Sequence, residues 1–142
     1  MSRLINKIII HCSATPPSVR ANADKIREWH LERGWDDIGY HFVITRAEEV
    51  EDGRDIDGDG NILEEIGAHT LGYNKNSIGI CLEGGVNEDG KPDANFLLGQ
   101  YILLKELVTK ILELFPEAEV DGHRSYGDTD CPCFDVKALL SL

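Results

Sequence analysis

Short runs of β-branched and other apolar residues constrain the fold of this chain most strongly. Lys7–Cys12 and Ser77–Leu82 are apolar almost throughout, which is typical of buried strands. Tyr40–Thr45 is a third predicted strand, Glu49–Gly53 is predicted to pair with it, and Glu119–Gly122 is a short strand. Because helical patterns separate these runs, the sequence predicts an α/β fold whose central sheet is largely covered.

Two amphipathic segments predict the helices that cover this sheet. The first is capped by Asn22 or Asp24 and runs to about Arg33. The second is predicted to begin at Asp93 and to end at Pro116, since proline cannot continue a helix. Its apolar stripe has helical spacing and consists of Leu97, Tyr101, Leu104, Val108 and Ile111.

Length and charge narrow the organisation and the partners. A chain of 142 residues suits one domain, and we expect residues 1–142 to form it. The net charge of −12 predicts repulsion from nucleic acids and from anionic lipid surfaces. The longest apolar run, Leu97–Leu104, is far shorter than the ~20 residues that span a bilayer, so we expect no membrane insertion. No secretory signal pattern precedes Ile8, so we expect synthesis in the cytoplasm.

The positions of histidine and cysteine suggest a metal site. His11 ends the first predicted strand, and His123 directly follows the short strand that ends at Gly122. Ligand sites of α/β sheets collect at such strand ends. Cys131 comes soon afterwards, and two histidines, one cysteine and a water would make a catalytic zinc site. The chain has five histidines and four cysteines, however, so this spacing also fits ordinary structural roles.

One segment after another resembles a known family. Ile8–Thr15, with the sequence IIIHCSAT, resembles the opening strand of the type-2 N-acetylmuramoyl-L-alanine amidases. That family includes the small phage amidases called lysozymes and the animal peptidoglycan recognition proteins. The likeness continues in the family's order and covers nearly the whole chain, through Trp29-His30, Gly34-Trp35, Ile38–Phe42, Gly67–His69, Tyr73–Cys81, Gly122–Arg124 and Cys131–Asp135.

The resemblance implies a fold, a reaction and a set of site residues. The fold would be a single α/β domain with a central mixed β-sheet flanked by helices. The reaction would be zinc-dependent hydrolysis of the amide bond between N-acetylmuramic acid and L-alanine in peptidoglycan. By position, the resemblance implies that His11, His123 and Cys131 bind one zinc ion. It also implies that Tyr40 acts in catalysis and that His69 lines the substrate cleft.

Thr129 departs from the pattern of the phage branch. It stands two residues before the implied zinc cysteine, where many phage members carry lysine and many animal members carry threonine. A threonine at this place offers a hydroxyl for hydrogen bonding instead of a cation. We therefore include Thr129 among the candidate catalytic residues in that reduced role.

The resemblance also implies a biological role. The chain would be a phage or prophage endolysin, a monomer that acts on the peptidoglycan of the cell wall after its release. The alternative is a non-catalytic module of the same fold that binds muropeptides. Non-catalytic members characteristically lose the zinc cysteine, so the presence of Cys131 and Tyr40 favours the enzyme.

Several of these residues also have ordinary structural interpretations. Tyr40 could be a half-buried strand aromatic, and His69 could be a turn histidine bonded to the backbone. His30 lies on the apolar face of the first helix, where a packed core histidine is expected. Trp35 fits either the core or stacking on substrate.

The remaining cysteines need no bridge in a chain of this size. Cys12 and Cys81 lie in apolar runs and are predicted to be buried free thiols. Cys133 stands where the family usually has a small residue, and it could be a bystander, a rival ligand or a site of oxidation.

An acidic segment carries a partial calcium motif. Asp55, Asp57 and Asp59 followed by Gly60 match the first part of an EF-hand loop. The bidentate glutamate should stand at position 12 of that loop, which here is Ile66. The sequence therefore leaves two interpretations, a Ca²⁺ site at the three aspartates or a solvated glycine-rich loop.

Overall fold

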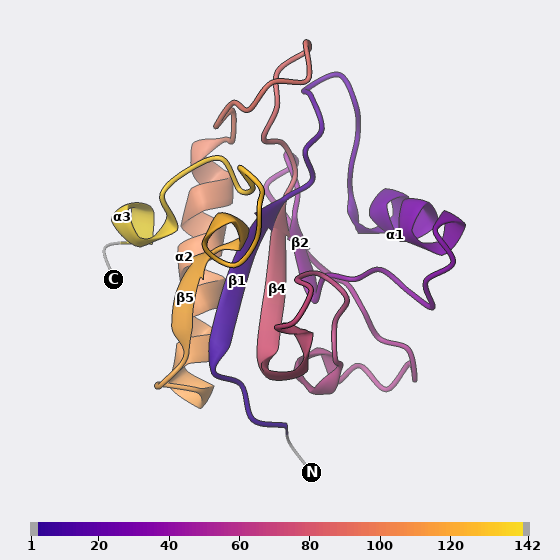
Figure 1. The fold of residues 1–142 in the computed structure, drawn as a ribbon, viewed down its shortest axis with the longest axis vertical. Coiled ribbons are helices and arrows are strands. Elements are labelled where there is room, and N and C mark those ends of the chain that lie inside the picture. The colour runs from indigo at the N-terminus through magenta and orange to yellow at the C-terminus, as the bar shows by residue number, and fades with distance from the viewer. Residues whose placement is uncertain (1–2, 141–142) are drawn as a thin grey trace.

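A five-stranded mixed sheet forms the centre of the molecule in the computed structural model, which describes residues 3–140 (Figure 1). The strands lie in the order β3-β2-β4-β1-β5. Their bounds are Lys7–Cys12 for β1, Phe42–Ile44 for β2, Val50–Asp52 for β3, Ser77–Leu82 for β4 and Glu119–Gly122 for β5. β1 pairs in parallel with β4 and β5, β2 pairs in parallel with β4, and only the β2–β3 pair is antiparallel. The predicted α/β fold with a mixed sheet is confirmed.

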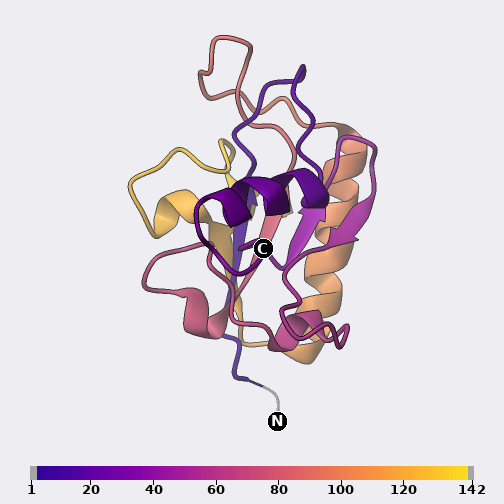
Figure 2. The same cartoon turned by 90° about the vertical axis from the view of Figure 1, so that its right-hand side faces the viewer.

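Helices cover the two faces of this sheet (Figures 1 and 2). Helix α1, Ala23–Glu32, lies on one face, and helix α2, Leu98–Leu114, lies along the other. A short helix α3, Val136–Leu140, follows the last loop. Three single-turn 3₁₀ helices complete the secondary structure of the described residues, η1 at Ile62–Glu64, η2 at Asn74–Asn76 and η3 at His123–Ser125. Within residues 3–140, none of the helices combines the length and the apolar character needed to cross a bilayer.

The alternation of side chains along β1 separates the core from the site. Ile8, Ile10 and Cys12 pack into the main core with α2, whose buried side chains include Leu104. Successive side chains of a strand point to opposite faces, so His11 points to the face that carries α1. The second core, beneath α1, is smaller, and its buried members are Ala21, Ala23, Ile26, Ile38, Val43 and Cys81.

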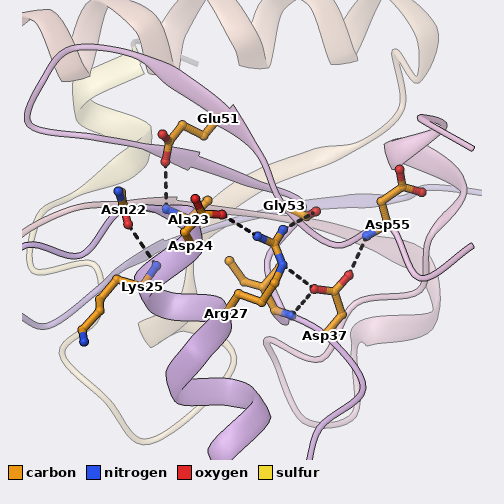
Figure 3. Close-up of polar contacts among 10 residues, drawn as sticks. Asn22, Ala23, Asp24, Lys25, Arg27, Asp37, Glu51, Gly53 and Asp55 are labelled. Atoms are coloured by element: carbon orange, nitrogen blue, oxygen red, sulfur yellow. Dashed lines mark hydrogen bonds and ion pairs between the residues drawn. The ribbon is translucent and has the colours of Figure 1, made fainter. Parts of the chain in front are cut away.

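A polar cluster around Arg27 fixes α1 against β3 and the start of the acidic loop (Figure 3). The guanidinium of Arg27 contacts Asp37 at 2.7 Å and Asp24 at 2.9 Å, and it donates to the backbone oxygen of Gly53. Asp37 also accepts from the backbone N–H of Asp55 at 3.0 Å. Burial alone would raise the pKa of Asp37, but these hydrogen bonds and the Arg27 charge lower it. Asp37 thereby ties the loop that leads into Tyr40 to α1 through Arg27 and to the acidic loop through Asp55.

The sequence places the strands and α1 well and misplaces the start of α2. The side chain of Asn22 caps α1 by accepting from Lys25 N, as expected for one of the two candidates. The predicted start of the long helix at Asp93 is wrong, because α2 begins at Leu98. The preceding segment is instead tied to the turn after β4 through Asn95, whose side chain accepts from Gly85 N and donates to Val86 O.

The predicted apolar stripe of the long helix includes Leu97, but the buried residue at this end of α2 is Gln100. Leu97 is 42% exposed, whereas Gln100 is fully buried. The Gln100 side chain accepts from Leu97 N and donates to the carbonyl oxygens of Ile44 and Glu83. This one amide therefore joins the first turn of α2 to the ends of β2 and β4.

Replacing Gln100 by methionine should destabilise the fold by about 2–4 kcal/mol. The volume is nearly kept, but the Glu83 carbonyl loses its donor and Leu97 N loses its acceptor, and each such loss costs roughly 1–3 kcal/mol. The Ile44 carbonyl keeps the hydrogen bond that it accepts from Glu83 N. Urea unfolding measures the free energy, with Glu106→Gln on the exposed side of the same helix as the control. Equal stability of the two variants would contradict this role for the amide.

Candidate active site

Three potential metal ligands meet at one edge of the sheet. His11 lies near the carboxyl end of β1, and His123 follows β5 directly. These two strands are parallel, so their ends lie at the same edge, and the two rings are 4.6 Å apart between centroids. Cys131 reaches them from the loop after η3. One donor atom each from His11, His123 and Cys131 lies within 4.8 Å of the others.

Backbone contacts hold the cysteine in this place. The thiol sulfur of Cys131 accepts a hydrogen bond from Cys12 N at 3.1 Å. The carbonyl oxygen of Cys131 accepts from Arg124 N at 2.7 Å. Gly122 allows the loop to close over β5, because a Cβ atom there would lie only 2.6 Å from Cδ of Pro132.

The donor set fits a catalytic zinc ion. Two imidazole nitrogens and one thiolate are typical zinc ligands, and three protein ligands leave a fourth position for water or substrate. Burial, followed by the nearby His123 and His41, holds the pKa of His11 well below its ordinary value. Burial also lowers the pKa of His123. Both rings are therefore neutral at pH 7, which is the form that binds a metal.

Tyr40 lies beside this donor set. Its ring is 5.0 Å from that of His11 and 5.6 Å from that of His30. His30 is buried, as expected, and its Nδ1 accepts from Gly39 N at 2.9 Å. This bond fixes the His30 ring where it packs against the Tyr40 ring. Burial, with a smaller contribution from nearby cysteine thiols, raises the pKa of Tyr40 well above its ordinary value. The phenol therefore keeps its proton and can act as a donor.

The neighbouring His41 has a different environment. It is fully buried, its Nδ1 accepts from Gly79 N at 3.0 Å, and its Nε2 lies 2.7 Å from the carbonyl oxygen of Glu65. Adjacent residues of an extended segment face opposite ways, so only one of the pair can point at the candidate metal site. That residue is Tyr40.

His69 touches both the donor set and an open pocket. Its Nδ1 lies 2.9 Å from Nε2 of His11, and its ring packs over Gly79, where a Cβ atom would come within 2.5 Å of it. The pocket beside it has a volume of about 390 Å³ and is lined by Trp35, Ala68, His69, Thr70, Leu71 and Asn74. Burial and the neighbouring His11 lower the pKa of His69 well below its ordinary value.

Two apolar side chains give this pocket an exposed rim. Trp35 is 36% exposed, and its ring lies tilted against that of His30 with the centroids 4.5 Å apart, so it belongs partly to the core and partly to the pocket wall. Leu71 is 95% exposed on the facing loop. The core role of Trp35 is thus supported in part, and stacking on substrate stays a prediction.

Thr129 lies in the loop that carries the cysteine. Its hydroxyl oxygen accepts from Cys131 N at 3.2 Å. The hydroxyl thus stabilises the loop next to the Cys131 sulfur, and its own proton remains available for donation.

The other three cysteines match their sequence-based interpretations in part. Cys12 and Cys81 are buried free thiols, as predicted. Cys133 is half-buried with a backbone φ of 75°, and it is not part of the ligand group. Burial raises the pKa of Cys133 to about 12, so it stays a neutral thiol.

The acidic loop brings four carboxylates together. Asp55, Asp57 and Asp59 are joined by Glu65 instead of a residue at position 66, within 4.8 Å of one another. The three aspartates also accept hydrogen bonds from the loop's own backbone, at 2.9–3.2 Å, and these bonds shape the turn. Calcium binding here stays a prediction.

The sequence patterns gave no indication of the polar residues that contact His11 and His69. Thr70 and Ser77 contact the histidines of the site, with Thr70 Oγ1 3.2 Å from His11 Nε2 and Ser77 Oγ 3.2 Å from His69 Nε2. The only local signal was that Thr70 follows His69 and that Ser77 begins a strand. Neither pattern predicts these contacts, of which the one between Thr70 and His11 joins residues 59 positions apart.

Comparisons with known proteins agree with this geometry. Residues 1–134 match a family model described as N-acetylmuramoyl-L-alanine amidase. The endolysin of Escherichia phage T7 is 44% identical over 130 residues, which are 92% of this chain and 82% of that protein. The amidase LysCS from Clostridium intestinale URNW has a similar structure, with a TM-score of 0.79 and 26% identity over 99% of this chain and 86% of that one.

A Drosophila relative extends the likeness beyond phages. A mutant of peptidoglycan-recognition protein LB, solved in complex with tracheal cytotoxin, has a TM-score of 0.73 and 28% identity over 99% of this chain and 82% of that one. The family, the fold and the enzyme class predicted from the sequence are thus confirmed. The chain belongs to the N-acetylmuramoyl-L-alanine amidase family.

Proposed function

We propose that this amidase hydrolyses the bond between N-acetylmuramic acid and L-alanine with one zinc ion held by His11, His123 and Cys131. The observation that carries the proposal is the convergence of these three donor atoms within 4.8 Å beside the phenol of Tyr40. A zinc ion supplies a Lewis acid that polarises the amide carbonyl and acidifies a water molecule near neutral pH.

The chain's own groups handle charge and protons around the scissile amide. The Tyr40 hydroxyl donates a hydrogen bond to the oxygen that gains negative charge, or passes its proton to the leaving amine. The Thr129 hydroxyl offers a second, weaker donor at the loop. The wall formed by Trp35, His69 and Leu71 holds the substrate next to these groups.

The same fold could instead bind muropeptides without cutting them. The complete His-His-Cys group and the adjacent phenol favour hydrolysis, because a binding module needs neither a metal nor a proton donor. The likeness to phage endolysins supports a role in cell-wall lysis. We propose that residues 1–142 form one domain, which acts in lysis as a monomer and has peptidoglycan as its partner. We also propose that it neither binds nucleic acid nor inserts into a membrane. We further propose that the protein is made in the cytoplasm and reaches the wall after release.

Digestion of purified peptidoglycan tests the reaction. An amidase releases new L-alanine amino termini and no new reducing sugar ends, and a chelator that removes zinc stops the release. Zinc should restore it after the chelator is dialysed away. Reducing ends in place of amino termini would overturn the proposal in favour of glycosidase chemistry.

For the acidic loop we propose a hydrogen-bonded surface turn and keep Ca²⁺ at Asp55, Asp57 and Asp59 as the alternative. The backbone hydrogen bonds to these aspartates account for the shape of the turn. We expect calorimetric titration with calcium to give no binding heat up to millimolar concentration. Heat that disappears in Asp57→Asn would assign a calcium site instead.

A further inference from the structure

One ring nitrogen of His11 is held by two polar neighbours. Nε2 of His11 lies 2.9 Å from Nδ1 of His69 and 3.2 Å from Oγ1 of Thr70. Those two atoms are themselves 2.9 Å apart, so the three form a closed triangle. Among the described residues, every hydrogen-bond contact of the His11 ring runs through Nε2. Nδ1 is thus the nitrogen left for a ligand.

Neighbouring groups of the chain hold Thr70 in place. Thr70 is 2% exposed, and the side chain of Asn74 accepts from the backbone N–H groups of both His69 and Thr70, each at 2.9 Å. The carbonyl oxygen of Thr70 accepts from Tyr73 N at 3.0 Å. These contacts close a tight turn that presents the hydroxyl to His11 with little freedom.

One arrangement of protons satisfies the whole network. If Nδ1 of His11 faces the metal, Nε2 carries the proton and can donate to Thr70 Oγ1. The Thr70 hydroxyl then donates to Nδ1 of His69. Nε2 of His69 carries its proton and donates to Ser77 Oγ at 3.2 Å. Each donor in this chain meets an acceptor, which is what a buried polar network requires.

We propose that Thr70 is a positioning residue of the metal site, whose hydroxyl fixes the tautomer and ring orientation of His11 so that Nδ1 is the ligand atom. This inference rests on the proposed zinc site and adds the group behind it. Metal-bound histidines commonly donate their second ring N–H to a neighbour that orients them. Here a hydroxyl, supported by the His69 ring, takes the place of the usual carboxylate or backbone carbonyl.

Zinc affinity of the Thr70 variants tests the inference. Thr70→Val removes the hydroxyl and keeps the shape, whereas Thr70→Ser keeps the hydroxyl. Competition with a chromophoric chelator should give zinc binding about 10–100-fold weaker for Thr70→Val. Thr70→Ser should bind zinc almost as tightly as the native protein. Equal affinity of Thr70→Val and the native protein would overturn the inference.

A second measurement keeps the outcome clear if Thr70→Val folds poorly. Nitrogen-15 NMR of the zinc-loaded native protein should show His11 with a proton on Nε2 and the metal on Nδ1. Metal on Nε2 would overturn the inference whatever the variant does. A native protein that takes up no zinc would refute the proposed function itself. One zinc per native chain with unchanged Thr70→Val affinity would refute only the role of Thr70.

Discussion

Replacement of Cys131 by serine is expected to abolish zinc binding and amidase activity together. The sulfur is the one proposed ligand of the group that binds as an anion, and a serine hydroxyl rarely replaces a thiolate on zinc. Loss of an outer neighbour typically costs 10–100-fold in affinity or activity, so loss of a direct ligand should cost more than about 100-fold. Zinc content after dialysis and release of alanine amino termini measure the two effects.

Cys133→Ser provides a matched control two residues away in the same loop. Cys133 is also half-buried, but it lies outside the ligand group, and its thiol stays protonated because burial raises its pKa to about 12. This variant should keep its zinc and its turnover. If Cys133→Ser lost the metal while Cys131→Ser kept it, the assignment of the sulfur ligand would be reversed.

The strands of this fold could be predicted because their residues decide their structure locally. The predicted bounds Lys7–Cys12 and Ser77–Leu82 agree with β1 and β4, and every residue of the two strands except Lys7 is buried. The placement of His11 and His123 at one sheet edge follows from the same patterns, since parallel strands end together. The strand patterns therefore indicated two of the three proposed ligands, while leaving ordinary structural roles for both histidines open.

The start of α2 and the surroundings of His11 could not be predicted, because they depend on contacts between distant segments. Asp93 has the local character of a helix start, but Asn95 ties that segment to the turn after β4, and the helix begins at Leu98. The contact of Thr70 with His11 joins residues 59 positions apart, and Thr70 is held there by the turn that the Asn74 side chain closes. No pattern in a single sequence indicates such a contact. The catalytic role proposed for Tyr40 also does not come from a local pattern, because it was implied by the family resemblance alone.

Replacement of Tyr40 by phenylalanine is expected to keep the zinc and lose the rate. The ring can remain between His11 and His30, so the ligand group should be undisturbed. The variant loses the hydroxyl, whose proton stays bound because burial raises the pKa of Tyr40. A positioned acid typically accelerates a reaction by 10²–10⁴-fold. We therefore expect turnover on peptidoglycan to fall by about 10²–10⁴-fold, with one zinc still bound per chain.

Tyr101→Phe separates this effect from the general loss of a phenol. Tyr101 lies on α2, on the opposite face of the sheet, where its ring packs against Phe96 and Phe134. Its variant should keep both zinc and turnover. Undiminished turnover in Tyr40→Phe would remove that side chain from the mechanism. A joint loss of zinc and turnover would instead make Tyr40 a support for the ligands, because a proton donor can be deleted without releasing the metal.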